Sequence, residues 1–203
     1  MINLKKSKIK IALGYLMLIL GIGILVYPLI LNRVVEYQDN KKIKQYFNQE
    51  NLNSETIIYK ENEEILKEDL YIGILEIPSI DLKKGFYEIN NVNNNVDKNI
   101  EILNGSDMPN IVNGTFILAG HSGSSIYSYF RNLNKLELNN KIYVYYNGYK
   151  YSYEVTNIYD IEKTGKIKIE KEPNMTALVL ITCRHNTNKQ IVIIADLLNE
   201  EKY

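Results

Sequence analysis

The sequence predicts a mainly β fold, an eight-stranded barrel with short helices, and one N-terminal transmembrane helix ahead of it. Three observations lead to this prediction. From Tyr71 onward the chain is a series of short β-rich runs separated by turn residues, as all-β barrels are. Asn147-Gly148 lies between two such runs and favours a two-residue hairpin. Residues 11–31 are apolar and contain no charge.

Composition excludes several classes of protein. The 203 residues carry 24 basic and 24 acidic side chains, so the formal net charge is zero. A dedicated nucleic-acid-binding protein needs a basic surface to displace counterions, and this chain offers none by composition. One cysteine excludes an intramolecular disulfide and a cysteine-rich structural zinc site.

The apolar run at residues 11–31 predicts a transmembrane signal anchor. As a helix it spans about 30 Å, the thickness of the hydrocarbon core of a bilayer. A cleavable signal peptide is the competing interpretation, but its apolar core is shorter and ends in a small-x-small cleavage site. The run from Tyr27 to Leu31 offers no such site. We therefore expect an anchor that is not cleaved.

The charges around the anchor predict its orientation. Residues 1–10 form a basic tail without an acid; its lysines are Lys5, Lys6, Lys8 and Lys10. Because basic residues flanking a membrane helix tend to stay in the cytoplasm, we expect a cytoplasmic tail and an extracellular remainder of the chain. Residues 32–70 are polar and charged, and we expect them to form a partly helical stalk or linker with weak tertiary contacts.

The folded domain is expected at residues 71–203. The pattern of its first part predicts strands at Tyr71–Ile77, Asp81–Tyr87 and Gly114–Ala119. The pattern at Asp81–Tyr87 is the weakest, and Gly114–Ala119 is apolar enough to be fully buried. Between and after these strands, Val96–Leu103 suggests a short helix and Ser125–Leu133 a helical turn.

The second part of the domain contains the clearest local pattern. The run Lys141–Val155 alternates β-rich residues on both sides of Asn147-Gly148, and its second strand is expected to continue to Ile161. Met175–Thr182 and Gln190–Leu198 form a final pair of strands joined by a short loop. Many short strands and little helix predict an antiparallel or mixed barrel.

Two residues could carry chemistry. His121 follows a predicted buried strand, flanked by Gly120 and Gly123, and loops on rigid scaffolds often hold functional groups. Cys183, the sole cysteine, ends another predicted core strand. Taken alone, His121 could be an ordinary turn residue and Cys183 an inert buried thiol. Together they fit a nucleophilic thiol with an imidazole base, provided that the barrel brings them side by side.

The pattern resembles the sortase family of cysteine transpeptidases. The residues that carry the resemblance are Ala119-Gly120-His121-Ser122-Gly123, Tyr129-Phe130-Arg131-Asn132-Leu133, and Leu180-Ile181-Thr182-Cys183 followed by a short loop and a β-rich last strand. The resemblance covers about Tyr71 to Leu198, and the N-terminal anchor also fits. It implies an eight-stranded β-barrel. Val179 departs from the family pattern, because a threonine is usual at that position.

The resemblance implies a function and roles for three residues. Cys183 would attack the Thr–Gly bond of a C-terminal Leu-Pro-X-Thr-Gly-like sorting signal on a secreted protein and form a thioacyl intermediate. His121 would be the general acid and base, and Thr182 would line the acyl site. The acceptor would be an amine of a cell-wall precursor or, in the polymerising classes, a pilin lysine. No cofactor is implied.

Three residues are candidates to stabilise the oxyanion that forms when the thiolate attacks the substrate carbonyl. Sortases generally carry an arginine at the start of the last strand, and that position is Gln190 here. Glutamine can donate a hydrogen bond but brings no charge. Arg184 could serve if the chain turns sharply after Cys183; if the strand continues, Arg184 points to the opposite face. Lys189 is a third candidate if a bulge shifts the register.

Other acidic and histidine residues give weaker signals. Asp107, Asp160 and Asp196 could orient His121, but the sequence selects none of them. His185 could join Cys183 and His121 around a metal, yet no carboxylate or second cysteine accompanies them, so we expect no metal site. Acids are too scattered for a calcium site. No Asp-Pro-Trp-like lid precedes the domain, which fits a small lidless class such as the housekeeping or class D-like enzymes.

Two alternatives stay open at this point. One is a Cys-His hydrolase of the same fold that releases acyl groups to water. The other is a membrane-tethered binding barrel whose catalysis is weakened, because Gln190 stands where arginine is usual.

Overall fold

The computed structural model describes residues 2–52, 70–164, 167, 169, 174–184 and 186–203. The chain divides into two compact units, residues 1–40 and residues 41–203. Within the described residues of the first unit, the chain is helical throughout. The second unit holds the last turns of the same helix and all the strands.

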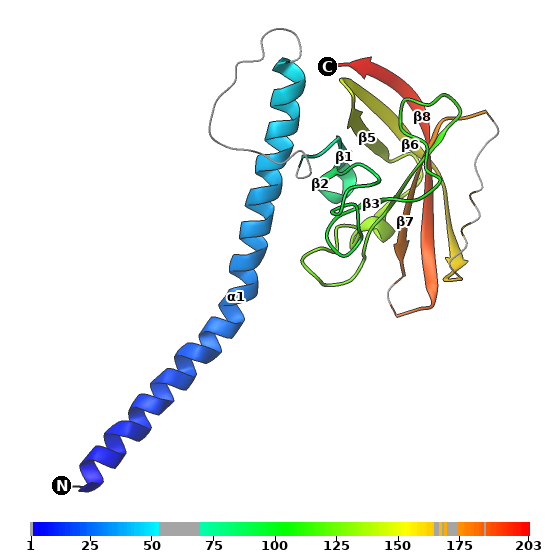
Figure 1. The fold of residues 1–203 in the computed structure, drawn as a ribbon. Helices are drawn as coiled ribbons and strands as arrows, with labels where there is room; N and C mark the ends of the chain where they lie inside the picture. Colours follow the sequence, from blue (N-terminus) through cyan, green and yellow to red (C-terminus); the bar gives the residue numbers. More distant parts are fainter. Residues whose placement is uncertain (1, 53–69, 165–166, 168, 170–173, 185) are drawn as a thin grey trace. The chain divides into compact units, whose positions relative to one another are not determined.

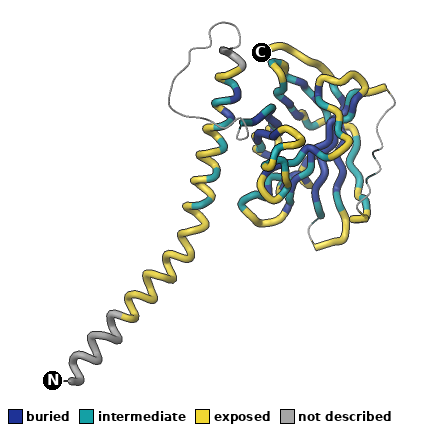
Figure 2. Tube along the Cα trace, in the orientation of Figure 1, coloured by how far each residue is buried: buried dark blue, intermediate teal, exposed yellow. Residues whose placement is uncertain are grey.

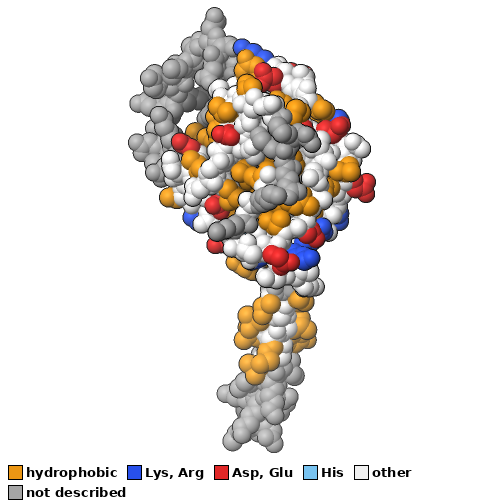
Figure 3. All heavy atoms as spheres, turned by 90° about the vertical axis from the view of Figure 1, so that its right-hand side faces the viewer, with side chains coloured by type: hydrophobic (Ala, Val, Ile, Leu, Met, Phe, Trp, Pro, Cys, Tyr) orange, Lys and Arg blue, Asp and Glu red, His pale blue; other side chains and the backbone are white. Residues whose placement is uncertain are grey.

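The first unit is formed by helix α1 (Ile2–Leu52), which runs on into the second unit. Its large apolar side chains from Leu13 to Ile30 are exposed, and the face visible in Figure 3 carries hydrophobic side chains. Over Leu13–Gln49 the helix is long and apolar enough to cross a membrane, judged by length and composition. The predicted N-terminal apolar helix is therefore present.

The second unit is built on one eight-stranded sheet that wraps into a nearly closed barrel, which confirms the predicted fold class (Figure 1). The strand order is β2-β1-β5-β6-β8-β7-β4-β3. The strands are β1 (Gly73–Ile77), β2 (Leu82–Phe86), β3 (Glu101–Ile102), β4 (Thr115–Ala119), β5 (Lys141–Tyr146), β6 (Tyr149–Glu162), β7 (Ala177–Cys183) and β8 (Lys189–Lys202). Two 3₁₀ helices are η2 (Pro78–Ile80) and η3 (Leu133–Lys135).

The short helix predicted at Val96–Leu103 is wrong, whereas the helical turn predicted at Ser125–Leu133 is present as successive turns. Residues 96–100 form one turn and a bend that lead into β3: the N–H groups of Lys98 and Asn99 both donate to the carbonyl of Asn95, at 2.9 and 2.8 Å, and the chain is extended again at Glu101. Residues 125–132 form a succession of turns, and regular 3₁₀ structure starts only at η3. There the N–H of Phe130 donates to the carbonyl of His121 at 3.0 Å, which folds the loop back on itself.

The predicted hairpin is confirmed. Tyr146 of β5 pairs with Tyr149 of β6, so the loop has only Asn147 and Gly148. Their φ angles are 53° and 76°, the positive values that this turn requires. Strand β8 extends to Lys202, beyond its predicted end at Leu198, because it pairs with the long β6 over its whole length.

The core of the barrel explains the apolar sequence of β7. Strand β7 lies between β4, to which it is parallel, and β8, to which it is antiparallel. Leu178 and Leu180 face the barrel interior, whereas Val179 and Ile181 pack into a second apolar cluster on the outer face. Both faces of the strand are covered, so the run is apolar throughout. The strands at the centre of Figure 2 are accordingly buried.

Residues 41–52 of α1 pack on the barrel, contrary to the weak contacts expected for the stalk. Ile43 and Tyr46 are buried together with Tyr71, Ile74 and Tyr87. The remaining part of the predicted stalk, residues 53–69, lies outside the described residues.

A candidate Cys-His active site

The parallel pairing of β4 and β7 brings His121 and Cys183 to the same end of the barrel. Ala119 is in register with Ile181, and the N–H of Gly120 donates to the carbonyl of Ile181 at 3.2 Å, so the pairing continues past the end of β4. Continuing this register by two residues sets His121 beside Cys183. His121 and Cys183 therefore both stand at the C-terminal ends of neighbouring parallel strands.

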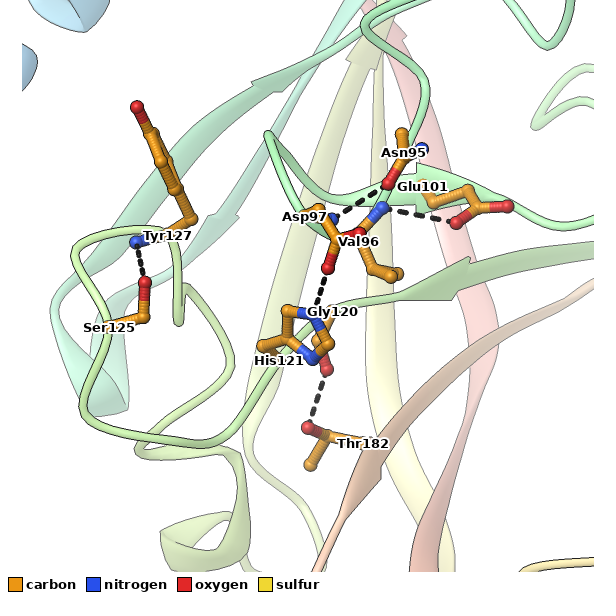
Figure 4. A network of polar contacts seen from close by, with 9 residues as sticks. All are labelled: Asn95, Val96, Asp97, Glu101, Gly120, His121, Ser125, Tyr127 and Thr182. Atoms are coloured by element: carbon orange, nitrogen blue, oxygen red, sulfur yellow. Dashed lines mark hydrogen bonds and ion pairs between the residues drawn. The ribbon is translucent and has the colours of Figure 1, made fainter.

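Two buried hydroxyl groups tie the strand ends together. The hydroxyl of Thr182 donates to the carbonyl of Gly120 at 2.6 Å (Figure 4), and the hydroxyl of Ser122 donates to the carbonyl of Cys183 at 2.5 Å. Thr182 and Ser122 are both buried. These bonds fix the backbone immediately next to His121 and Cys183. Thr182 is predicted to line the acyl site. Side chains alternate along a strand, so Thr182 lies on the same face of β7 as Leu178 and Leu180, which is the face opposite Cys183.

Gln190 lies directly opposite Cys183. The two residues are in register across the antiparallel pair β7–β8, so their side chains lie on the same face of the sheet. This is the outer face, which carries Val179 and Ile181 of β7. Gln190, Cys183 and His121 therefore form a row across β8, β7 and the end of β4, here called the cross-strand row. Cys183 is half-buried and is a free thiol.

The two cationic candidates lie elsewhere. The backbone N–H of Arg184 donates to the carbonyl of Lys189 at 2.9 Å, which continues the ladder and sets Arg184 on the face opposite Cys183. Its side-chain Nε donates to Asp160 Oδ1 at 2.8 Å. Lys189, one residue from Gln190, lies on that same opposite face, with its Nζ 3.9 Å from Glu162 Oε1.

None of the three acids proposed from the sequence is bonded to His121 within the described part of the chain. Asp160 binds Arg184, and Asp107 accepts the backbone N–H of Thr115 at 2.8 Å. Asp196 is buried on β8 with one carboxylate oxygen unpartnered.

The acid that meets His121 is Asp97, with 2.9 Å between His121 Nε2 and Asp97 Oδ1 (Figure 4). The sequence does not single out Asp97, because the contact joins residues 24 positions apart in the chain. The asparagine-rich run before it, Asn91 to Asn95, is the signal that favoured turns over a helix.

Among the residues that the structure describes, no group of three His, Cys, Asp or Glu side chains could hold a metal ion. His185, considered from the sequence as a third metal ligand and not expected to be one, lies outside those residues.

Comparisons with known proteins identify the family to which the chain is similar. The family model described as the sortase domain matches residues 75–198. A search of curated proteins finds no match. Among solved structures, sortase A from Listeria monocytogenes is 24% identical, with a TM-score of 0.56, and the alignment covers 66% of this chain and 90% of that one.

Two further structures show the same fold. Sortase C-3 from Streptococcus pneumoniae is 19% identical (TM-score 0.59), with 80% of this chain and 84% of that one aligned. The sortase D5 transpeptidase from Clostridium perfringens is 17% identical (TM-score 0.56), with 81% and 98% aligned. The family match covers more than half of the chain, from within β1 to within β8. This protein therefore belongs to the sortase family, the cysteine transpeptidases.

Proposed function

We propose that this protein is a membrane-anchored transpeptidase that cleaves a C-terminal Leu-Pro-X-Thr-Gly-like sorting signal and transfers the secreted protein to a cell-wall amine. Cys183 is the nucleophile, His121 the general acid and base, and Gln190 the donor to the oxyanion. The observation that supports the proposal is the register of the strands: Cys183, a free thiol, pairs with Gln190 across β7 and β8, and His121 follows β4, the strand parallel to β7.

The first half of the reaction forms a thioester. The thiolate of Cys183 attacks the carbonyl carbon of the threonine in the Thr–Gly bond, and the carbonyl oxygen becomes an oxyanion. The side-chain N–H of Gln190, directly across from Cys183, can donate to that oxyanion. The C–N bond then breaks, and His121 donates a proton to the leaving amine of glycine. The acyl group stays on Sγ.

The second half transfers the acyl group. An incoming amine attacks the thioester carbonyl, His121 accepts a proton from its nitrogen, and the C–S bond breaks to release the Cys183 thiolate, which restores the starting thiolate and imidazolium. A neutral donor at position 190 stabilises the two tetrahedral intermediates less than a guanidinium does, because hydrogen bonds from charged donors are about twice as strong. We therefore expect slow turnover.

The membrane arrangement completes the proposal. Residues 1–10 form a cytoplasmic tail, 11–31 the anchor, 32–70 the linker, and 71–203 the extracellular catalytic barrel. The basic tail and the exposed apolar helix support this arrangement. Its partners are secreted proteins with sorting signals and an amine of peptidoglycan or of its lipid-linked precursor.

An acceptor assay tests the proposed transfer. The full chain in detergent is incubated with a fluorescent Leu-Pro-X-Thr-Gly peptide, with and without triglycine, and the products are separated by mass. We expect the peptide joined to triglycine to replace the hydrolysed peptide as triglycine is added. A product spectrum that ignores triglycine would contradict transfer and favour a hydrolase. Cys183→Ala is the control that removes the nucleophile.

A further inference from the structure

We propose that Asp97 is the positioning residue of His121. Its carboxylate accepts the Nε2–H of the imidazole, which leaves Nδ1 as the nitrogen that exchanges protons at Cys183 and at the leaving amine. This inference rests on the proposed role of His121 as acid and base. The two atoms in contact, His121 Nε2 and Asp97 Oδ1, are 2.9 Å apart, and Figure 4 shows the carboxylate directed at the imidazole.

The direction of the hydrogen bond follows from its chemistry. An ionised carboxylate can only accept hydrogen bonds, so the nitrogen that contacts Asp97 carries the proton in both the neutral and the charged imidazole. In the neutral ring, Nδ1 then holds the free lone pair. A third group that fixes the tautomer and orientation of a catalytic histidine is the recurring part of nucleophile–base–orienter sites.

The loop around Asp97 is fixed by side chains of its own. The backbone N–H of Asp97 donates to Asn95 Oδ1 at 2.8 Å, and the N–H of Val96 donates to Glu101 Oε2 at 3.1 Å (Figure 4). Asn99, two residues on, is buried and donates through Nδ2 to the carbonyl of Gly85 at 2.9 Å. The backbone on both sides of Asp97 is therefore attached to the barrel, and its carboxylate is held at His121.

Stability does not account for the pair. The side chain of His121 is 44% exposed and that of Asp97 is 80% exposed. Exposed ion pairs contribute little to folding. Removal of Asp97 should therefore affect the orientation of His121 without unfolding the barrel, and this separates a positioning role from a structural one.

The test compares Asp97→Ala, Asp97→Asn and the control Glu201→Ala, all in the full chain in detergent. Glu201 is also exposed and lies 2.9 Å from its cationic partner, Lys150, so its removal deletes a carboxylate of the same kind away from the cross-strand row.

For Asp97→Ala we expect kcat for the sorting peptide to fall about tenfold with KM little changed, because orientation matters for chemistry more than for binding. Asp97→Asn keeps an acceptor oxygen and should lose less. Glu201→Ala should match the wild type.

A spectroscopic reading accompanies the kinetics. The chain has two histidines, so labelling with ¹⁵N-histidine gives few signals. We expect a downfield Nε2–H proton of His121 in the wild type and in Glu201→Ala, and its loss in Asp97→Ala at an unchanged melting temperature. An unchanged kcat in Asp97→Ala, a higher kcat, or a fall in kcat with an unchanged Nε2–H signal would each overturn the proposal.

A measurement without substrate tests the positioning role of Asp97 separately from the proposed function. The rate of alkylation of Cys183 by iodoacetamide is measured for the wild type, His121→Ala and Asp97→Ala. We expect both variants to slow alkylation in comparison with the wild type, because a correctly oriented imidazole promotes the thiolate. If no sorting peptide is cleaved but Asp97→Ala slows alkylation, the proposed function fails and the positioning role stands. Equal alkylation rates in the wild type and Asp97→Ala would overturn the positioning role.

Discussion

Thr182 shows how one hydroxyl group positions the site. Its Oγ1 donates to the carbonyl of Gly120 at 2.6 Å and is buried between β7 and the end of β4. Thr182→Val keeps the shape of the side chain but leaves that carbonyl without this donor. We expect the free energy of unfolding to fall by about 1–3 kcal/mol, the cost of an unsatisfied buried polar group. Urea unfolding checks this, with Thr182→Ser, which keeps the hydroxyl, as the control. Equal losses in both variants would contradict the role of the bond.

Gln190 is the second residue that decides the properties of the cross-strand row. Because it faces Cys183 directly, Gln190→Arg would bring a positive charge to the proposed oxyanion. We expect kcat to rise up to about tenfold, within the range that a single oxyanion donor supplies. Gln190→Ala should lower kcat by about tenfold or more.

Arg184 is the alternative candidate for the oxyanion role that is proposed for Gln190. The guanidinium of Arg184 binds Asp160 on the other face of β7, so it has a partner away from Cys183. Steady-state kinetics on both variants checks the assignment. No gain in Gln190→Arg, together with complete loss of activity in Arg184→Ala, would move the oxyanion role to Arg184.

At the scale of elements, the β5–β6 hairpin depends on its turn. Gly148 has a φ angle of +76°, and a Cβ added there would meet no atom within 4 Å. The cost of Gly148→Ala is therefore one of backbone conformation alone, and we expect a loss of about 1–2 kcal/mol in the free energy of unfolding. Asn147→Gly should be nearly neutral, because glycine accepts positive φ. A neutral Gly148→Ala in thermal or urea unfolding would mean that the hairpin is not held by this turn.

The elements also show what the sequence could predict. The hairpin was predictable because its turn chemistry is local, and β7 was predictable because both of its faces are buried. Strand β3 was missed because it has only two residues and pairs with β4 across a long loop. Gln190 could be located by counting along the strands. Asp97 could not, since its contact with His121 spans 24 positions and depends on the asparagine turns before it.

At the scale of the whole molecule, the last turns of α1 belong to the same unit as the barrel. Phe47 is the centre of this contact: its ring lies 5.2 Å from that of Tyr145 and 5.7 Å from that of Tyr203. The hydroxyl of Tyr203 also donates to the hydroxyl of Tyr46, at 3.2 Å. The contact joins this part of α1 to β5 and to the residue that follows β8.

This contact predicts a stability effect far from the candidate site. In Phe47→Ala we expect the barrel to lose about 1–3 kcal/mol, less than for a fully buried phenylalanine because Phe47 is only partly buried. Tyr37→Ala is the matched control, since Tyr37 is on the same helix and 73% exposed. Thermal unfolding in detergent compares the two. Equal melting temperatures for Phe47→Ala and the wild type would contradict the contact, whereas kcat should change little in either variant.

The central claim is that Cys183 carries the acyl group, and one measurement tests it most directly. The full chain is mixed with a Leu-Pro-X-Thr-Gly peptide without an added amine, quenched in acid, and measured by intact mass and by peptide mapping. We predict an adduct of the acyl fragment on Cys183 that hydroxylamine removes and that is absent in Cys183→Ala. Wild-type protein that accumulates no such adduct under these conditions, or an adduct that persists in Cys183→Ala, would contradict the account.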